Sequence, residues 1–327
     1  MTHDRGLMLK VSFPFNITDL NDSVLLPANV PFDESMAGSI AELGRRKNHP
    51  TSCLLKHGSV RTDLENFMQK APYDVIFDGP EGVSTHLERI GEVPVSAPLL
   101  DILDNFRAHD FYTYRHSLTV FALTSFLLNS DAHGEHVENN LLMVGPTHDL
   151  GKLLIPDQIL NKRTPLTHEE RCLLEQHTVA GYILLCYYLG DHKHPAALAA
   201  LNHHERRDGS GYLRGLNELD PIVEMLAACD VYDALISSRP YRPVNYDNRS
   251  ALEELTDIAA AGALDWRCVQ TLIGRNRAGH PAPDQVDVSL EKRGYQPPGN
   301  CYARFADNES TSPQQLTPEV PSKPLPG

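Results

Sequence analysis

Residues 148–152 bring three chemically useful side chains together: His148, Asp149 and Lys152. An imidazole and a carboxylate that follow one another can bind metal from one helix end, and the two oxygens of an aspartate can bridge two cations. Gly151 lets the backbone turn, so that the lysine reaches the same place. Taken alone, the string is as typical of a polar helix C-terminus with a cationic cap, so a metal site needs further donors.

More histidines lie where they could join this pair. His116 and His177 each fall in the middle of a predicted helix among apolar residues. A single histidine in such a stripe is more often a hydrogen-bonded core residue than a ligand. His203 and His204 end another predicted helix. Because neighbours on a helix point about 100° apart, both reach one cluster only from its edge, and the alternative for this pair is an exposed polar helix end.

Two aspartates share the apolar stripe of a further predicted helix. Asp230 and Asp233 lie at helical spacing on the same face as Ile222, Leu226 and Cys229. Buried unpaired carboxylates are costly, so each must be paired, hydrogen-bonded or bound to metal. A salt bridge to a lysine or arginine is the alternative, and the number of histidines in the chain favours metal.

Together these donors come from several separate helices and are all imidazoles or carboxylates. This mixture suits iron, manganese, zinc or cobalt rather than magnesium or calcium. The set is larger than one tetrahedral ion needs, which favours two ions. A single structural zinc is a poor explanation, because such sites prefer cysteine thiolates and closed sets of four ligands.

The elements that position these residues are predicted to be helices. From about residue 96, apolar residues recur at helical spacing between clusters of Gly, Pro and Asp. Thr167 followed by Glu170 forms a capping box, which predicts a helix that begins at His168. Residues 96–305 are therefore predicted to be all-α, with helices over residues 97–109, 112–129, 137–150, 168–189, 195–205, 221–237, 247–261 and 265–275.

Residues 1–95 show a different pattern and predict a smaller α+β domain. Apolar residues alternate from Leu7 to Phe13 as in a half-buried strand, residues 75–77 form a second candidate strand, and residues 34–44 are typical of a helix. This segment lacks a catalytic motif, which favours a regulatory or dimerising role or contact with a signalling partner. Residues 306–327 are polar and rich in proline, a composition that cannot bury a core and predicts a disordered tail.

The bulk composition narrows the class of function. The 327-residue chain is 41% hydrophobic and carries a formal net charge of -14. This acidic balance argues against general DNA or RNA binding, while local cations still allow a small nucleotide in one cleft. The six cysteines form no CxxC pair and are typical of core residues in a reducing compartment. With neither a signal sequence nor a membrane-spanning apolar run, we expect a cytoplasmic protein.

Over residues 98–290 the chain resembles the HD-GYP branch of the HD phosphohydrolase superfamily. Six blocks occur in the order that the family shows, which makes the match specific. They are residues 112–117, 148–152, 166–170 together with His177, 203–212, 230–235 and 239–242.

This resemblance implies an all-α HD-type helical bundle that hydrolyses cyclic di-GMP to pGpG, to GMP or to both. The reaction would use a hydroxide held between two metal ions, with iron as the first choice of metal and manganese as the second. Asp149 would bridge the ions as a catalytic residue, and Lys152 would contact the reacting phosphate. Tyr212, Arg239 and Arg242 fall where members contact the nucleotide, although for the two arginines a solvated surface loop is as good an explanation. The implied ligands of the first ion are His116, His148, Asp149 and Asp230, and those of the second are His177, His203 and His204.

The sequence departs from the family pattern at a few positions. Leu213 stands where the signature usually has proline, a change expected to loosen the loop. Tyr112 occupies the place where some members have a glutamate for a third metal, so we expect two ions. Arg207 replaces a common tryptophan and adds charge near the cleft.

Other functions are compatible with the same motifs. The first alternative is a phosphodiesterase for another cyclic dinucleotide, such as cyclic GMP-AMP; the loop at residues 203–212 argues against nucleoside triphosphates and alarmones. The second is a non-catalytic sensor of cyclic di-GMP, which Leu213 keeps open. The complete ligand set favours the enzyme, because a binding protein does not need a bridging hydroxide.

Overall fold

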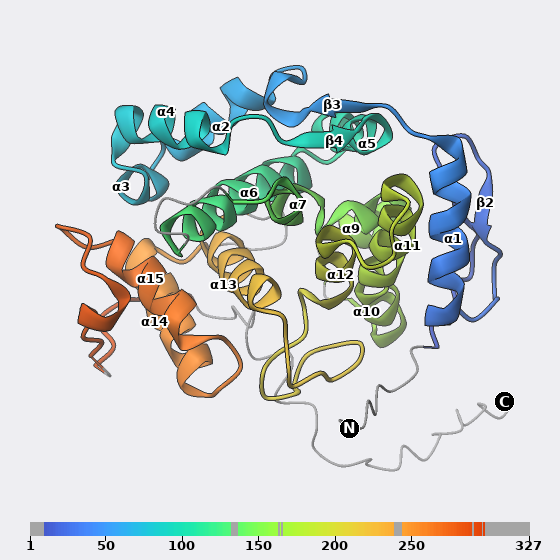
Figure 1. Ribbon diagram of the computed structural model, residues 1–327. Helices are drawn as coiled ribbons and strands as arrows, with labels where there is room; N and C mark the ends of the chain where they lie inside the picture. Colours follow the sequence, from blue (N-terminus) through green and yellow to red (C-terminus); the bar gives the residue numbers. More distant parts are fainter. Residues whose placement is uncertain are drawn as a thin grey trace, which may run out of the picture.

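The computed structural model describes residues 10–131, 137–162, 164, 166–238, 244–289, 291–295 and 297. Within these residues the chain is mostly helical, with a few short strands near the N-terminus (Figure 1). None of the helices in the described part is long and apolar enough to cross a membrane. The predicted tail at residues 306–327, together with Arg239 and Arg242, lies outside the described residues.

Six elements surround the centre of the helical part: α6 (Phe111–Asp131), α8 (Val144–Thr147), η2 (Leu150–Leu154), α11 (His177–Leu189), α12 (Pro195–Asn202) and α13 (Pro221–Ile236). Helix α11 packs against α12 and η2, and α6 packs against α8 and α13. The polar residues discussed above lie at the ends or on the inward faces of these elements. The all-α prediction for this part of the chain is therefore confirmed.

Local capping signals explain where several helices begin. Helix α10 (His168–Glu175) begins with the predicted capping box, in which Thr167 and Glu170 satisfy each other's backbone N–H groups. Asp220 accepts a hydrogen bond from the backbone N–H of Ile222 at the start of α13. Predicted helices agree with α5 (Ala97–His109), α14 (Asn248–Ala260) and α15 (Trp266–Arg275) to within one residue at each end.

Two of the predicted long helices are broken in the structure. The segment expected to run from 137 to 150 divides into α7 (Asn139–Leu142), α8 and η2, with Pro146 unable to donate a helical hydrogen bond. At Gly145 an added Cβ would lie 2.5 Å from the Cα of Phe121, so close contact with α6 needs a glycine there. The segment 168–189 divides at Gln176 into α10 and α11.

The prediction of a strand at residues 75–77 is wrong, because this segment belongs to α3 (Tyr73–Ile76). Tyr73, Ile76 and Phe77 are buried while Val75 is 46% exposed, a helical spacing that packs against α4 (Gly79–Ile90). The apolar residues of the proposed first strand begin outside the described residues, and Val11 forms only an isolated bridge with Phe32.

The strands of the N-terminal part form two short antiparallel pairs. Strand β1 (Ile17–Thr18) pairs with β2 (Val24–Leu26), and β3 (Thr51–Cys53) pairs with β4 (Pro94–Ser96). The remaining short elements of the described chain are η1 (Leu54–Lys56), α9 (Asp157–Leu160) and η3 (Pro283–Gln285). The expected mixture of strands and helices is thus present, in small amounts.

In Figure 1 the N-terminal part runs across the top of the helical part, with α2 (Val60–Met68) to α4, and down its right edge, with α1 (Glu34–Lys47). Helix α1 packs against α11, while α2 packs against α6. One cluster of buried apolar side chains includes Phe13 at one end of the chain and Val286 at the other. A domain boundary near residue 95 stays a prediction, since the residues on both sides share this core.

Candidate metal centre

The structure brings together all seven residues predicted to bind metal, from separate elements. His203 and His204 follow α12, His177 begins α11, and Asp230 lies on the inward face of α13. Six of the seven side chains are almost fully buried and His204 is half-buried. The other three members of the set are His116 on α6 and the pair between α8 and η2, His148 and Asp149.

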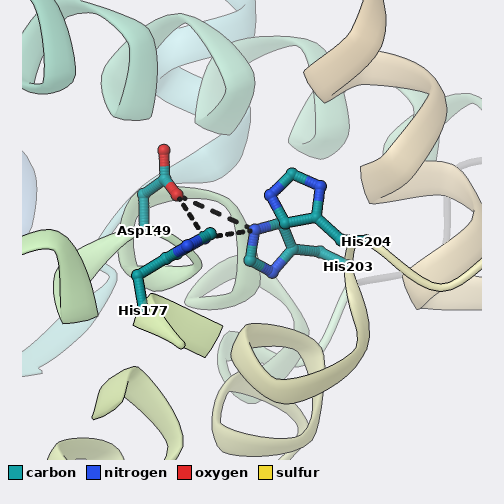
Figure 2. A group of neighbouring side chains, drawn as sticks. All are labelled: Asp149, His177, His203 and His204. Carbon is teal, nitrogen blue, oxygen red and sulfur yellow. Dashed lines mark hydrogen bonds and ion pairs between the residues drawn. The ribbon is translucent and has the colours of Figure 1, made fainter. Parts of the chain in front are cut away.

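One group of donors lies around a single oxygen of Asp149 (Figure 2). Its Oδ1 is 3.3 Å from Nε2 of His177 and 3.7 Å from Nε2 of His203. The two Nε2 atoms are 3.3 Å apart, and the His204 ring lies beside that of His203 with centroids 4.0 Å apart. These four residues can each offer a ligand atom to one metal ion.

A second group lies on the opposite oxygen of the same carboxylate. Asp149 Oδ2 is 3.7 Å from Nε2 of His116 and 3.5 Å from Nε2 of His148. Asp230 adds a further carboxylate, with its Oδ1 3.0 Å from Nε2 of His116. Because Asp149 belongs to both groups through different oxygens, it is placed as a bridge between two ions would be.

Backbone carbonyls set the orientation of three of the imidazoles. His148, His177 and His203 each donate a hydrogen bond from Nδ1 to the carbonyl three residues earlier, at 2.7, 2.7 and 2.9 Å. A carbonyl only accepts, so Nδ1 carries the proton and Nε2 is left to face the centre. The breaks in the helices near residues 145 and 176 lie beside these carbonyls.

Several buried acceptor atoms in this cluster lack a hydrogen-bond partner in the described part of the chain, which suits the binding of metal ions. Nε2 of His148, Oδ1 of Asp149 and Oδ2 of Asp230 are buried and lack a hydrogen-bond partner among the described residues. Leaving such atoms unpaired costs about 1–3 kcal/mol each. The facing Nε2 atoms of His177 and His203 are also acceptors when both rings are neutral. Divalent ions between these atoms would satisfy them all.

The two carboxylates are held in their ionised form. Burial alone would raise the pKa of Asp149, but the charge of Lys152 and the contact with His148 outweigh it and hold that pKa well below its usual range. Burial also opposes ionisation of Asp230, and the neighbouring His116 again holds the pKa well below normal. Metal ligation needs deprotonated carboxylates, so both residues are in the required state.

Burial keeps two of the imidazoles neutral. It lowers the pKa of His203 to about 4, although the nearby Asp149 carboxylate acts in the opposite direction. For His204, burial and then the charges of His203 and His177 lower the pKa well below its usual value. Neutral imidazole is the form that binds metal, so these rings need no deprotonation at neutral pH.

The residues predicted to contact substrate lie beside this centre where the structure describes them. Lys152 places Nζ 2.5 Å from Oδ2 of Asp149, and its side chain is 18% exposed. The Tyr212 ring stacks on His204 with centroids 4.7 Å apart and planes 26° apart. Arg239 and Arg242 fall outside the described residues.

Sequence reasoning did not single out Glu205, which holds the loop that carries Tyr212. Its fully buried carboxylate accepts hydrogen bonds from the backbone N–H groups of Arg214 at 2.7 Å and Leu216 at 3.0 Å. Gly211 lies so close to Glu205 that a Cβ there would be 2.4 Å from the Glu205 Cα. The loosening expected from Leu213 is therefore opposed by a buried anchor. Because Glu205 lies between the polar residues His204 and Arg206, its sequence context did not indicate that it is buried.

We expect Glu205→Ala to destabilise the protein. The two backbone N–H groups would lose their acceptor inside the fold, which costs about 1–3 kcal/mol for each. Denaturant unfolding should show a lower free energy of unfolding, while Glu218→Ala, an exposed glutamate in the same segment, should stay within about 0.5 kcal/mol of the parent chain. Equal unfolding midpoints for the two variants would contradict the anchoring role.

The second aspartate on α13 also has a role that spacing alone left open. Asp233 is fully buried, and its Oδ2 lies 2.6 Å from Nδ1 of His116. It forms an ion pair with Arg115 at 3.1 Å. The sequence offered metal or a salt bridge for this carboxylate, and the structure shows the salt bridge, with His116 as a second partner.

The sequence is similar to those of known proteins. Residues 122–266 match the model of the HD domain family. A cyclic di-GMP phosphodiesterase of Thermotoga maritima is 38% identical over 48% of this chain and 41% of its own length. A cyclic di-GMP phosphodiesterase response regulator of Xanthomonas campestris pv. campestris is 43% identical over 42% of this chain and 36% of its own.

A 3'3'-cGAMP-specific phosphodiesterase of Vibrio cholerae is 33% identical over 50% of this chain and 37% of its own length. The chain thus spans about two fifths of the length of these relatives. The family match includes His148, Asp149, His177, His203, His204 and Asp230 of the histidine and aspartate cluster. Residues 122–266 of this chain therefore match the HD domain family.

Proposed function

We propose that this chain is a metal-dependent phosphodiesterase that opens cyclic di-GMP to linear pGpG and can cleave it further to GMP. The observation that carries the proposal is the pair of ligand groups that share the buried carboxylate of Asp149. Two-ion centres of this kind are suited to in-line displacement at a phosphodiester. Relatives named as cyclic di-GMP phosphodiesterases support the choice of substrate.

Two divalent ions suit the mixed imidazole and carboxylate donors, with iron as the first choice and manganese as the second. When bound, such ions supply Lewis acidity toward phosphoryl oxygens and a nucleophile from water at neutral pH. One would be held by His116, His148, Asp149 and Asp230, and the other by Asp149, His177, His203 and His204. The burial of these donors and their approach to one another support this assignment, because little reorganisation would be needed for binding.

The remaining residues would act on the substrate itself. The Lys152 ammonium lies at the edge of the cluster and would neutralise charge that develops on the phosphoryl oxygens. The Tyr212 ring, held beside His204, offers an aromatic face against which a guanine base can stack. We assign Arg239 and Arg242 to the phosphates of the nucleotide, because guanidinium groups bind phosphate through two hydrogen bonds.

The second candidate is a phosphodiesterase for 3'3'-cGAMP. It rests on the similarity to relatives named for that substrate. The ligand cluster serves both substrates equally, since they share the phosphodiester and differ in one base. Binding without turnover is the third candidate, but a sensor has no chemical need for two ions on one carboxylate.

Turnover by purified protein tests the proposal. The chain is purified without oxygen, its metal is counted, and cyclic di-GMP and 3'3'-cGAMP are incubated in parallel with Fe²⁺ or Mn²⁺. We expect about two ions per chain, release of pGpG or GMP, and loss of turnover after treatment with a chelator that is reversed by adding metal. Faster hydrolysis of 3'3'-cGAMP would favour the second candidate. A metal-loaded chain that binds cyclic di-GMP without hydrolysing it would support the sensor.

A further inference from the structure

A hydrogen bond from the N-terminal part reaches the network behind the metal cluster. The Tyr73 hydroxyl, at the start of α3, donates to Oδ1 of Asp233 on α13 at 2.5 Å. Both residues are buried, with Tyr73 3% and Asp233 0% exposed. The Tyr73 ring packs edge-on against Tyr232, with ring centroids 6.4 Å apart. This contact joins segments 160 residues apart in the sequence.

The same aspartate orients one of the ligand imidazoles. Oδ2 of Asp233 accepts a hydrogen bond from Nδ1 of His116 at 2.6 Å. The opposite nitrogen, Nε2, then faces Asp149 and Asp230. A carboxylate on the remote nitrogen of a metal-binding histidine fixes both the tautomer and the ring orientation.

His116 differs in this respect from other histidines of the cluster. The rings of His148, His177 and His203 are oriented by carbonyls three residues earlier in their own segments. That of His116 depends on a side chain from another helix, so it turns correctly only if Asp233 is itself held. Local backbone structure secures the first three, whereas tertiary contacts must secure His116.

The carboxylate of Asp233 is held by three different side chains. Arg115 supplies an ion pair, and Ser237 donates to Oδ2 at 2.8 Å. At Oδ1 the short contact is the one from Tyr73, since Arg115 lies 3.3 Å from that atom. The tyrosine hydroxyl therefore limits rotation of the carboxylate on the side away from His116.

We propose that Tyr73 is a positioning residue for the metal centre. Through Asp233 it holds the His116 ring with Nε2 toward the ion that His116, His148, Asp149 and Asp230 would bind. The inference rests on the metal sites of the proposed function and extends them. The N-terminal part of the chain, in which no catalytic motif was found, supplies a hydrogen bond on which one of the two ions depends.

Metal affinity in Tyr73→Phe tests this role. The full chain is stripped of metal and titrated with Mn²⁺ against a chelating indicator, so that the two binding steps are resolved without substrate. Loss of a hydrogen bond behind a metal-binding histidine typically weakens affinity about 10- to 100-fold. We expect one step to weaken by about tenfold and the other to change less than about twofold.

A matched control separates positioning from general packing. Tyr114 on α6 donates to Oδ2 of Asp63 at 2.8 Å and joins the same two parts of the chain, and its hydroxyl is not among the hydrogen-bond partners of Asp233 described above. Tyr114→Phe should leave both binding steps within about twofold of the parent. Tyr73→Phe that behaves like this control, or that weakens both steps equally, would overturn the proposal.

A double-mutant cycle tests whether the effect passes through His116. In a His116→Ala background the tyrosine has no ring to orient, so adding Tyr73→Phe should not weaken metal binding further. A further loss of about tenfold in that background would also overturn the proposal. Two ions bound by the parent chain without hydrolysis would reject the proposed function and leave the role of Tyr73 intact. A parent chain that binds no ion would reject both.

Discussion

Asp149→Ala will remove the metal centre and abolish turnover of cyclic di-GMP. The reason is that both ligand groups use this carboxylate, one through each oxygen. Losing it leaves each ion with histidines and at most one other carboxylate, and removes the charge that holds the two ions together. Metal content should fall from about two ions per chain to less than one. The rate should fall about 10³-fold or more, since the ions supply several kcal/mol of transition-state stabilisation.

Two further variants make this result specific. Asp157→Ala removes an exposed aspartate from the nearby helix α9 and should keep its metal and its rate. Asp149→Asn keeps the size of the side chain but not its charge, and should also lose at least one ion. Circular dichroism checks that each variant is folded. Full metal load and full rate in Asp149→Ala would end the assignment of this residue as a bridge.

The helices around the site were largely predictable because their signals are local. Capping residues such as Thr167 and Asp220 satisfy the first N–H groups, and apolar spacing marks the buried face. The segments carrying His177 and Asp230 could therefore be assigned from the sequence. That they meet in one place is a tertiary fact, and only the order of the family blocks indicated it beforehand.

Several details that fix the ligands depend on tertiary contacts and could not be predicted. The break near Gly145 lies where α6 comes close to the backbone, and the carbonyls that accept from the His148 and His177 rings lie beside the breaks near Gly145 and Gln176. Whether a carboxylate such as Asp233 meets metal or an arginine depends on which residues of other helices face it. The partnership between Tyr73 and Asp233 spans most of the chain, and the segment of Tyr73 was itself predicted to be a strand. Short apolar runs do not distinguish a strand from a buried helical turn.

Lys152→Met will slow catalysis while leaving the metal centre in place. Lys152 is not a ligand, yet its ammonium lies 2.5 Å from Oδ2 of Asp149 and its side chain remains partly exposed. A cation there can meet a phosphate that enters the cluster. Methionine keeps the unbranched apolar stem but not the charge. Removing one group that stabilises developing charge costs about 10²–10³ in kcat, so we expect a fall of that size with about two ions still bound.

Comparing the effect of Lys152→Met on kcat with its effect on metal content distinguishes two roles for Lys152. Its charge is the main favourable influence that holds the pKa of Asp149 well below normal against the effect of burial. If that were its whole role, Lys152→Met would lose metal and rate together, and added Mn²⁺ would restore both. If the ammonium meets the phosphate, excess metal will restore neither rate nor KM, while Lys152→Arg should recover part of kcat because it returns a cation.

Lys162→Met is the matched control. Lys162 pairs with Glu170 and is not among the cluster residues, so this variant should leave kcat unchanged. An unchanged rate in Lys152→Met would show that the two ions alone neutralise the phosphoryl oxygens.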